Sequence, residues 1–203
     1  MRQPLDRKLW KRSKYLCGID EAGLGPLAGP VVAAAIVLPA NCLLPGVNDS
    51  KLLTPKQRAV LYDRILGKCL TCGVGIVNSR RVDEINVRNA GFEAMTRAFN
   101  RMALKPDYTI VDGWRIPGLD VPQEGIIKGD QKSLTIAAAS IIAKVTRDAI
   151  MVRMHLRYPG YGLDRNKGYG TPEHLAALEA LGVTPIHRRS FEPVRAAMVN
   201  SEV

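Results

Sequence analysis

The sequence has no long hydrophobic segment of the kind that crosses a membrane. Its longest run with few charges, Thr135 to Val145, is too short and too rich in alanine and serine to span a bilayer. The N-terminal stretch MRQPLDRKLWKRSK is too polar to contain the apolar region of a signal peptide. We therefore expect a cytoplasmic protein that has no membrane partner.

Cysteine is also scarce, with 4 residues in a chain of 203. Cys69 and Cys72 form one C-x-x-C pair, which would be a redox pair or half of a zinc site. No second C-x-x-C and no H-x-x-x-H follows at the spacing of a zinc site. All the cysteines are therefore expected to act as small buried hydrophobic residues.

The chain contains no repeat, low-complexity tract or linker, and its length suits one domain. Apolar runs alternate with capped, periodic segments, which predicts an α/β domain with a mixed sheet and helices on its faces. The expected strands are 15–19, 31–38, 73–78, 108–111 and 125–127. The expected helices are 55–67, 79–103 with a break near 89–91, 134–157 and 172–182, followed by a separate helical element after Pro185.

The charge balance is strongly basic. Lysine and arginine number 29 against 19 acidic residues, which gives a formal net charge of +10. Such a surplus attracts polyanions, because a field of several kT draws in phosphates before any specific contact forms. Solubility explains the same surplus, so charge alone leaves nucleic acid binding and a bland solvated surface equally open.

Acidic residues stand at the ends of three expected strands: Asp20 with Glu21, Asp112, and Asp130. Taken singly, each is a common turn former or helix cap. Together, four acids in one cleft of a basic protein would repel one another unless cations neutralised them, and oxygen ligands select Mg²⁺ or Mn²⁺. Two such ions roughly 3.5 to 4 Å apart activate a water and stabilise the leaving oxygen in phosphodiester hydrolysis.

Glycines and lysines flank these acids. The loop Gly23-Leu24-Gly25 offers backbone N–H groups to a sugar-phosphate, although short glycine-rich loops usually serve only as tight turns. Asp49-Ser50-Lys51 begins the next helical region, and three lysines surround Asp130. These lysines are Lys128, Lys132 and Lys144. They are either solvated surface charges or groups that position a phosphate backbone without reading its sequence.

Two further segments near the C-terminus combine aromatic and basic residues. In the first, Tyr161, Lys167, Gly168 and Tyr169, a tyrosine ring either stacks on a sugar or base or packs in the core. In the second, His187-Arg188-Arg189, the basic groups either bind phosphates or hold the tail through ion pairs, and we favour the second role.

The chain resembles the ribonuclease HII family from about Leu16 to Val194. The motifs that carry the resemblance, in the family's order, are GIDEAGLGPLAGPVVAAAIVL, NDSKLLT, VDG, IIKGDQKSLTIAAASIIAKVTRD, YPGYG, NKGYGT and TPIHRRSF. It implies a ribonuclease H-like fold in a single domain over 1–203, with a core of about 14–158 and a C-terminal helical region of about 159–203.

The resemblance also implies an activity and its residues. Asp20, Glu21, Asp112 and Asp130 match the family's metal-binding and catalytic acids, and Tyr169 matches the tyrosine that stacks on the DNA sugar at an RNA/DNA junction. The implied substrates are RNA/DNA hybrids and duplex DNA with embedded ribonucleotides, as in ribonucleotide excision repair. Cleavage 5′ to the ribonucleotide would use Mg²⁺ or Mn²⁺ and leave 3′-hydroxyl and 5′-phosphate ends. The expected substrate contacts are Gly23, Leu24, Gly25, Ser50, Lys51, Lys128 and Tyr169, in a monomer.

Three residues depart from the family's usual pattern, and each replaces a polar group with an apolar one. Leu24 stands where the loop normally reads G-R-G, Leu52 where the motif reads D-S-K-K, and Trp114 where D-G-N is typical. An alternative is therefore a catalytically impaired, hybrid-binding protein of the same fold. The related ribonuclease HIII family usually has an additional N-terminal domain, whereas the acidic pair here lies near the start of the sequence, so we expect ribonuclease HII.

Overall fold

Five strands form one mixed sheet in the computed structural model, which describes residues 4–47 and 50–200 apart from the side chains of residues 51 and 200. The strands are β1 (Leu16–Ala22), β2 (Val31–Val37), β3 (Thr71–Val77), β4 (Tyr108–Asp112) and β5 (Gln123–Ile126), in the order β3-β2-β1-β4-β5. β2 pairs antiparallel with β1 and β3, whereas β4 pairs parallel with β1 and β5. The predicted mixed sheet is confirmed.

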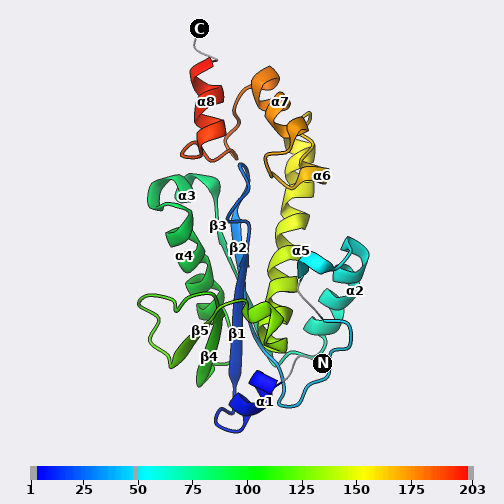
Figure 1. Ribbon diagram of the computed structural model, residues 1–203, viewed down its shortest axis with the longest axis vertical. Helices are drawn as coiled ribbons and strands as arrows, with labels where there is room; N and C mark the ends of the chain where they lie inside the picture. The colour runs from blue at the N-terminus through cyan, green and yellow to red at the C-terminus, as the bar shows by residue number, and fades with distance from the viewer. Residues whose placement is uncertain (1–3, 48–49, 201–203) are drawn as a thin grey trace.

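Helices cover both faces of this sheet (Figure 1). On one face lie α3 (Ser79–Ile85) and α4 (Val87–Asn100), and on the other lie α2 (Pro55–Leu66) and α5 (Leu134–Arg157). β2 is buried along its whole length, because Val31, Ala33, Ala35 and Val37 face α4 while Ala34 and Ile36 face α5. Its apolar run therefore marks a strand buried on both faces, as the sequence predicted.

Close packing of the two layers depends on glycine. A Cβ on Gly75 of β3 would collide with the backbone of α4, and one on Gly18 of β1 would stand 2.6 Å from the Thr135 carbonyl carbon of α5. Both helices therefore lie directly on the sheet, which fixes the edge at which β1 and β4 end.

The first helix, α1 (Pro4–Trp10), was not predicted, yet it caps the longest one. Asp6 is buried and its carboxylate accepts four hydrogen bonds, from the Ser133 hydroxyl, the Leu134 N–H, and the N–H and hydroxyl of Thr135. These groups belong to the first turn of α5, whose N–H groups have no partner within the helix. A residue distant in sequence thus completes the N-terminal cap, in which Ser133 accepts the Ile136 N–H.

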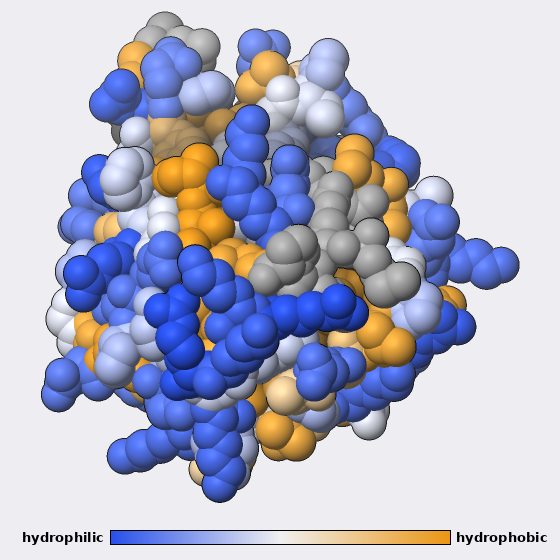
Figure 2. Space-filling model, turned by 60° about the horizontal axis from the view of Figure 1, so that its bottom comes forward, coloured by the Kyte–Doolittle hydropathy of each residue, from blue (hydrophilic) through white to orange (hydrophobic). Residues whose placement is uncertain are grey.

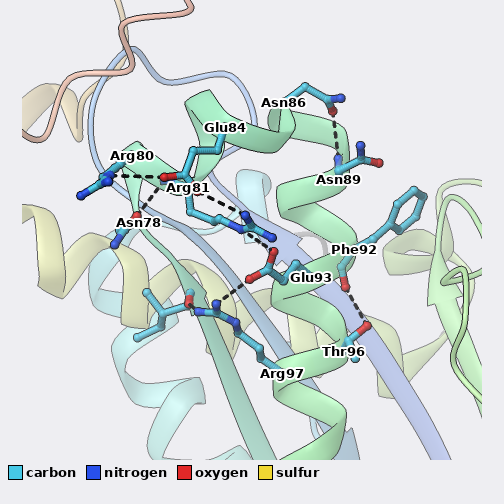
Figure 3. Close-up of polar contacts among 11 residues, drawn as sticks. Asn78, Arg80, Arg81, Glu84, Asn86, Asn89, Phe92, Glu93, Thr96 and Arg97 are labelled. Carbon is cyan, nitrogen blue, oxygen red and sulfur yellow. Dashed lines mark hydrogen bonds and ion pairs between the residues drawn. The ribbon is translucent and has the colours of Figure 1, made fainter.

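The helix break after β3 lies at Asn86, so the prediction of a break near 89–91 was wrong. Asn86 has φ 65°, ends α3, and accepts the Asn89 N–H with its side chain to begin α4 (Figure 3). Asparagine tolerates a left-handed φ and caps helices, which makes it a stronger break than Gly91 inside α4. The cap of α3 is Asn78, whose side chain accepts the Arg81 N–H.

Three short helices complete the fold beyond the end of α5: α6 (Leu163–Asn166), α7 (Pro172–Leu181) and α8 (Glu192–Asn200). The helical tail predicted after Pro185 is confirmed as α8. Leu27 and Ala28, from the loop between β1 and β2, pack with Leu163, Leu178 and Val194 of these helices. The C-terminal helices are therefore tied to the loop that follows the acidic pair.

Surface and cysteines agree in part with the sequence-based expectations. Hydrophilic side chains cover much of the face shown in Figure 2, with hydrophobic ones exposed in separate patches. No helix in the described part of the chain is long and apolar enough to cross a membrane. Cys17 is buried as predicted, whereas Cys42, Cys69 and Cys72 are only partly buried, and all four are free thiols. Burial raises the pKa of Cys72 to about 12, so this thiol stays protonated.

Candidate active site

The four acids singled out in the sequence line one cavity of about 350 Å³. Asp20 and Glu21 lie in β1, Asp112 ends β4, and Asp130 lies in the 3-10 helix η2 (Gly129–Gln131) that follows β5. The other lining residues are Ala22, Gly23, Leu24, Gly25, Ser50, Ser140, Lys144, Arg147 and Tyr169.

Parallel pairing explains why the acids meet. Ile19 of β1 stands opposite Val111 of β4, so the next residues, Asp20 and Asp112, lie side by side where the pairing of these two strands ends. The turn after β5 returns to them, because the Gly129 N–H donates to Asp112 Oδ1 at 2.6 Å. The sequence suggested that Asp20 and Glu21 follow the strand. They lie within it, because β1 continues to Ala22 through its pairing with β2.

Asp20 carries the strongest electrostatic conflict in this cavity. Burial, followed by the charges of Glu21 and Asp112, raises the pKa of Asp20 well above its usual range, while a hydrogen bond from Ser140 opposes the shift. The Ser140 hydroxyl lies 2.9 Å from that of Ser50, in the 3-10 helix η1 (Ser50–Leu52). In the described residues, no three His, Cys, Asp or Glu side chains are already gathered around one point as metal ligands. The acids therefore share one cavity in which the charges of Glu21 and Asp112 act on Asp20.

Two buried arginines that the sequence did not connect to the site hold the loop between β1 and β2 in place. We call this loop, residues 23–30, the glycine loop. Arg188 is fully buried and donates to the carbonyls of Gly23, Leu24 and Gly29. Burial, and next the charge of Arg147, lower the pKa of Arg188 to about 9. We had favoured ion pairs as the means by which this basic segment holds the tail, but Arg188 uses loop carbonyls.

Arg147, on α5, joins the glycine loop to the loop of Tyr169. Its side chain is buried and donates to the carbonyls of Ala28, Pro30 and Lys167 at 3.1, 2.9 and 3.0 Å. Gly23, with φ 99°, leaves no room for a side chain, because its Cβ would collide with Arg147. The only sequence signal was an arginine on the apolar side of a long helix, which more often indicates a solvated charge.

The two tyrosines of the C-terminal segment have different environments. Tyr161 is buried and donates its hydroxyl hydrogen toward the carbonyls of Leu181 and Gly182, so it belongs to the core. Tyr169 is 45% exposed at the cavity, with Lys144 Nζ and Arg147 Cζ each 5.9 Å from its ring centroid. Its Cε1 atom lies 3.7 Å from where a Cβ on Gly25 would stand, so the glycine loop and the tyrosine face each other.

The remaining residues predicted to contact substrate are distributed unevenly. Ser50 is buried and lines the cavity, whereas Lys128 and Lys132 are exposed and lie outside its lining. Lys144 lines the cavity and pairs with Asp148 at 2.8 Å. The side chain of Lys51 and the whole of Asp49 lie outside the described residues.

The three departures lie at or near the cavity without displacing the acids. Leu24 lines the cavity and is 37% exposed, Leu52 is 68% exposed, and Trp114 follows Asp112 and is 63% exposed. Each of these apolar side chains is thus exposed to solvent at the surface.

Comparisons with known proteins point to one family. The sequence profile of the family described as ribonuclease HII matches residues 17–194. A ribonuclease HII from Lachnoclostridium phytofermentans is 51% identical over 178 residues, covering 88% of this chain and 70% of the relative. The crystal structure of ribonuclease H2 from Pyrococcus horikoshii is similar with a TM-score of 0.80 at 29% identity, over 91% of this chain and 97% of that one. The fold is also that of Bst ribonuclease HIII in complex with Mn²⁺, with a TM-score of 0.68 at 17% identity, over 93% of this chain and 71% of that one.

Proposed function

The chain belongs to the ribonuclease HII family, and from this membership we propose that it hydrolyses the RNA strand of RNA/DNA hybrids and incises duplex DNA 5′ to embedded ribonucleotides. The observation that carries the proposal is the single cavity lined by Asp20, Glu21, Asp112 and Asp130 and faced by the glycine loop and Tyr169. The products would carry 3′-hydroxyl and 5′-phosphate ends.

The cavity fits Mg²⁺ or Mn²⁺. All four candidate ligands are carboxylates, which are the hard oxygen donors these ions prefer. Burial, and next the charges of Glu21 and Asp112, raise the pKa of Asp20, and this supports the assignment because a nearby cation would stabilise the charged form of each acid. When bound, a pair of such ions supplies an activated water and positive charge at the leaving oxygen.

The chain's own residues orient these ligands. The Ser140 hydroxyl hydrogen-bonds Asp20 and also contacts the Ser50 hydroxyl. Through this contact, η1 helps to fix the position of Asp20. The Gly129 N–H holds Asp112 Oδ1. Both carboxylates are therefore held in place before substrate arrives, which reduces the reorganisation that binding requires.

The glycine loop and Tyr169 form the proposed ribose slot. Gly23 and Gly25 line the cavity, and their backbone N–H groups are proposed to meet the 2′-hydroxyl of a ribonucleotide. Arg147 and Arg188 bind carbonyl groups of this loop, which fixes its shape without using the N–H groups of these two glycines. Lys144 lies beside the slot, and Ser50, Lys51 and Lys128 are proposed to position phosphates without reading base sequence.

Cleavage of an end-labelled RNA/DNA hybrid, with and without a chelator, tests the proposal. We expect cleavage in Mg²⁺ or Mn²⁺ and none in excess chelator. The same hybrid in Ca²⁺ reports binding without turnover. A chain that binds the hybrid but never cleaves it would instead be the catalytically impaired binding protein that the three departures suggested.

A further inference from the structure

A patch of apolar and cationic side chains borders the cavity on the side of α4. It consists of Leu24, Arg88, Phe92 and Trp114, and we call it the α4 patch. The Arg88 guanidinium carbon lies 5.9 Å from the Phe92 ring centroid and 6.0 Å from that of Trp114. Leu24 Cδ2 lies 3.3 Å from where a Cβ on Gly91 would stand, so the patch continues from α4 to the cavity wall.

Trp114 is held on a fixed turn although its ring is exposed. The Gly113 N–H donates to the Ile126 carbonyl, and the Trp114 N–H donates to the Asp112 carbonyl at 3.1 Å. The Trp114 Cα lies only 2.9 Å from where a Cβ on Gly125 would stand, so this turn lies tightly on β5. With 63% of the residue exposed, the ring gains little from burial in the fold itself.

The chemistry of the patch suits a nucleotide. An aromatic ring offers a face on which any base or sugar stacks, and the neighbouring guanidinium offers charge to the adjoining phosphate. Phe92 projects from α4 away from Glu93 and Arg97, which are occupied with each other and with Arg81 (Figure 3). Arg88 is exposed beside both rings, so its charge is open to a phosphate from solvent.

The cavity thus has an aromatic residue on each flank. Tyr169 lies on the α5 side beside Lys144 and Arg147, and Trp114 lies on the α4 side beside Arg88. The sheet separates these two layers, so a strand whose scissile phosphate lies at the acids extends towards both flanks. The resemblance places Tyr169 on the DNA sugar at an RNA/DNA junction. Because the DNA follows the ribonucleotide at such a junction, Tyr169 would lie downstream of the cut, which leaves the α4 side for the upstream nucleotides.

We propose that Trp114 and Arg88 form a second substrate subsite, in which Trp114 stacks on a nucleotide of the cut strand upstream of the cleavage point. This inference rests on the proposed function. Because the subsite touches nucleotides and not the reacting atoms, it acts on substrate binding, and Trp114 is a specificity-determining residue. Its ligand is a base or sugar of either DNA or RNA with the adjoining phosphate.

A binding experiment without turnover tests the contact directly. The chain has 2 tryptophans, and the other, Trp10, lies in α1 among Leu9, Leu16 and Ile136, so Trp10→Phe leaves Trp114 as the single indole fluorophore. Two single-ribonucleotide duplexes are compared in Ca²⁺, one with a long upstream flank and one that ends just upstream of the cleavage point. We expect the long flank to quench or shift the Trp114 emission and the short flank to leave it unchanged.

Kinetics provide the second arm. For the long-flank duplex, we expect Trp114→Ala to raise KM about 5- to 100-fold while kcat stays within about twofold, as stacking on one base implies. Trp114→Phe should retain most of the affinity, because it keeps an aromatic face. Leu156→Ala, which removes a side chain that is 79% exposed on α5 and outside the cavity lining, is the matched control.

The outcomes separate this inference from the function it rests on. A wild-type protein that cleaves normally while Trp114→Ala leaves KM unchanged, or raises it equally on both duplexes, overturns the subsite and keeps the nuclease. A signal that depends on the downstream flank or on the uncut strand also overturns it. Wild-type protein that neither binds nor cleaves the duplex overturns both.

Discussion

Asp112 is the acid at which a substitution can remove a proposed metal ligand while leaving the fold intact. It ends β4, is half-buried, and holds the η2 turn through one hydrogen bond from the Gly129 N–H. An asparagine retains the oxygen that accepts this bond and removes the charge that a cation would need. Loss of the carboxylate also relieves repulsion on Asp20.

We therefore predict that Asp112→Asn lowers kcat by about 100-fold or more, since removing one charged ligand costs several kcal/mol of transition-state stabilisation. Its melting temperature should equal or exceed that of the wild type. Steady-state cleavage and thermal unfolding measure the two effects. Wild-type turnover in this variant would remove Asp112 from the catalytic set.

Sequence reasoning located the acids but not the buried arginines, and the reason is physical. Asp20 and Asp112 each follow a short, largely apolar run, and parallel pairing brings such positions together whatever the details of the loops. The surroundings of Arg147 and Arg188 depend on carbonyls from distant loops, which no local pattern records. The same holds for Trp114, whose neighbour Arg88 comes from a different layer.

Among the helices, α5 has a cap that could be predicted only in part from the sequence. Ser133 caps it locally, as expected for this residue type, but the buried carboxylate of Asp6 from α1 satisfies two backbone N–H groups and two hydroxyls as well. The starts of α2 and α7 were predictable, because each has a threonine cap followed by a proline at the first helical position. The short α1 depends on tertiary contacts, and the helix break depends on the asparagine cap at Asn86.

We predict that Asp6→Ala destabilises the protein by about 2 to 4 kcal/mol, because buried donors at the start of α5 lose a charged acceptor. The free energy of unfolding in urea measures this loss. Asp120→Ala, at an exposed position in the loop before β5, is the matched control and should change stability by less than about 0.5 kcal/mol. Equal stability of the two variants would mean that α1 contributes nothing to the cap.

At the scale of the whole molecule, a hydrogen-bonded histidine pair joins the C-terminal helices to the site. The Thr184 N–H donates to His187 Nδ1, which places the proton of His187 on Nε2, 3.0 Å from His174 Nε2. His174 Nδ1–H then donates to the Tyr169 carbonyl at 2.9 Å. This relay requires both rings to be neutral.

The assignment of residues 1–203 to a single domain and the monomeric state remain predictions.

The pair should make stability depend on pH. Burial, and next the charge of His174, lower the pKa of His187 to about 4 from the usual 6.5, and burial also lowers the pKa of His174. The unfolded chain therefore binds more protons below pH 6.5, so stability is complete above that pH and falls as the pH decreases towards 4.

Unfolding measured in urea between pH 6.5 and 5 tests this link. We expect His187→Gln to lose less stability than the wild type over this range, by up to about 1 kcal/mol per pH unit. Comparison with the variant is needed because Asp20, whose pKa is raised, titrates with the opposite sign. Parallel pH profiles for the two proteins would show that the pair is protonated without cost.

Incision of a duplex DNA that contains a single ribonucleotide is the decisive test of metal-dependent cleavage at the four acids. The duplex is labelled at the 5′ end of the cut strand and incubated with wild type and Asp112→Asn in Mg²⁺, in Mn²⁺ and in excess chelator. We expect one metal-dependent product from the wild type, ending in a 3′-hydroxyl immediately 5′ to the ribonucleotide, and almost none from the variant. Cleavage that persists in chelator, falls elsewhere in the duplex, or is unchanged in Asp112→Asn would contradict this expectation.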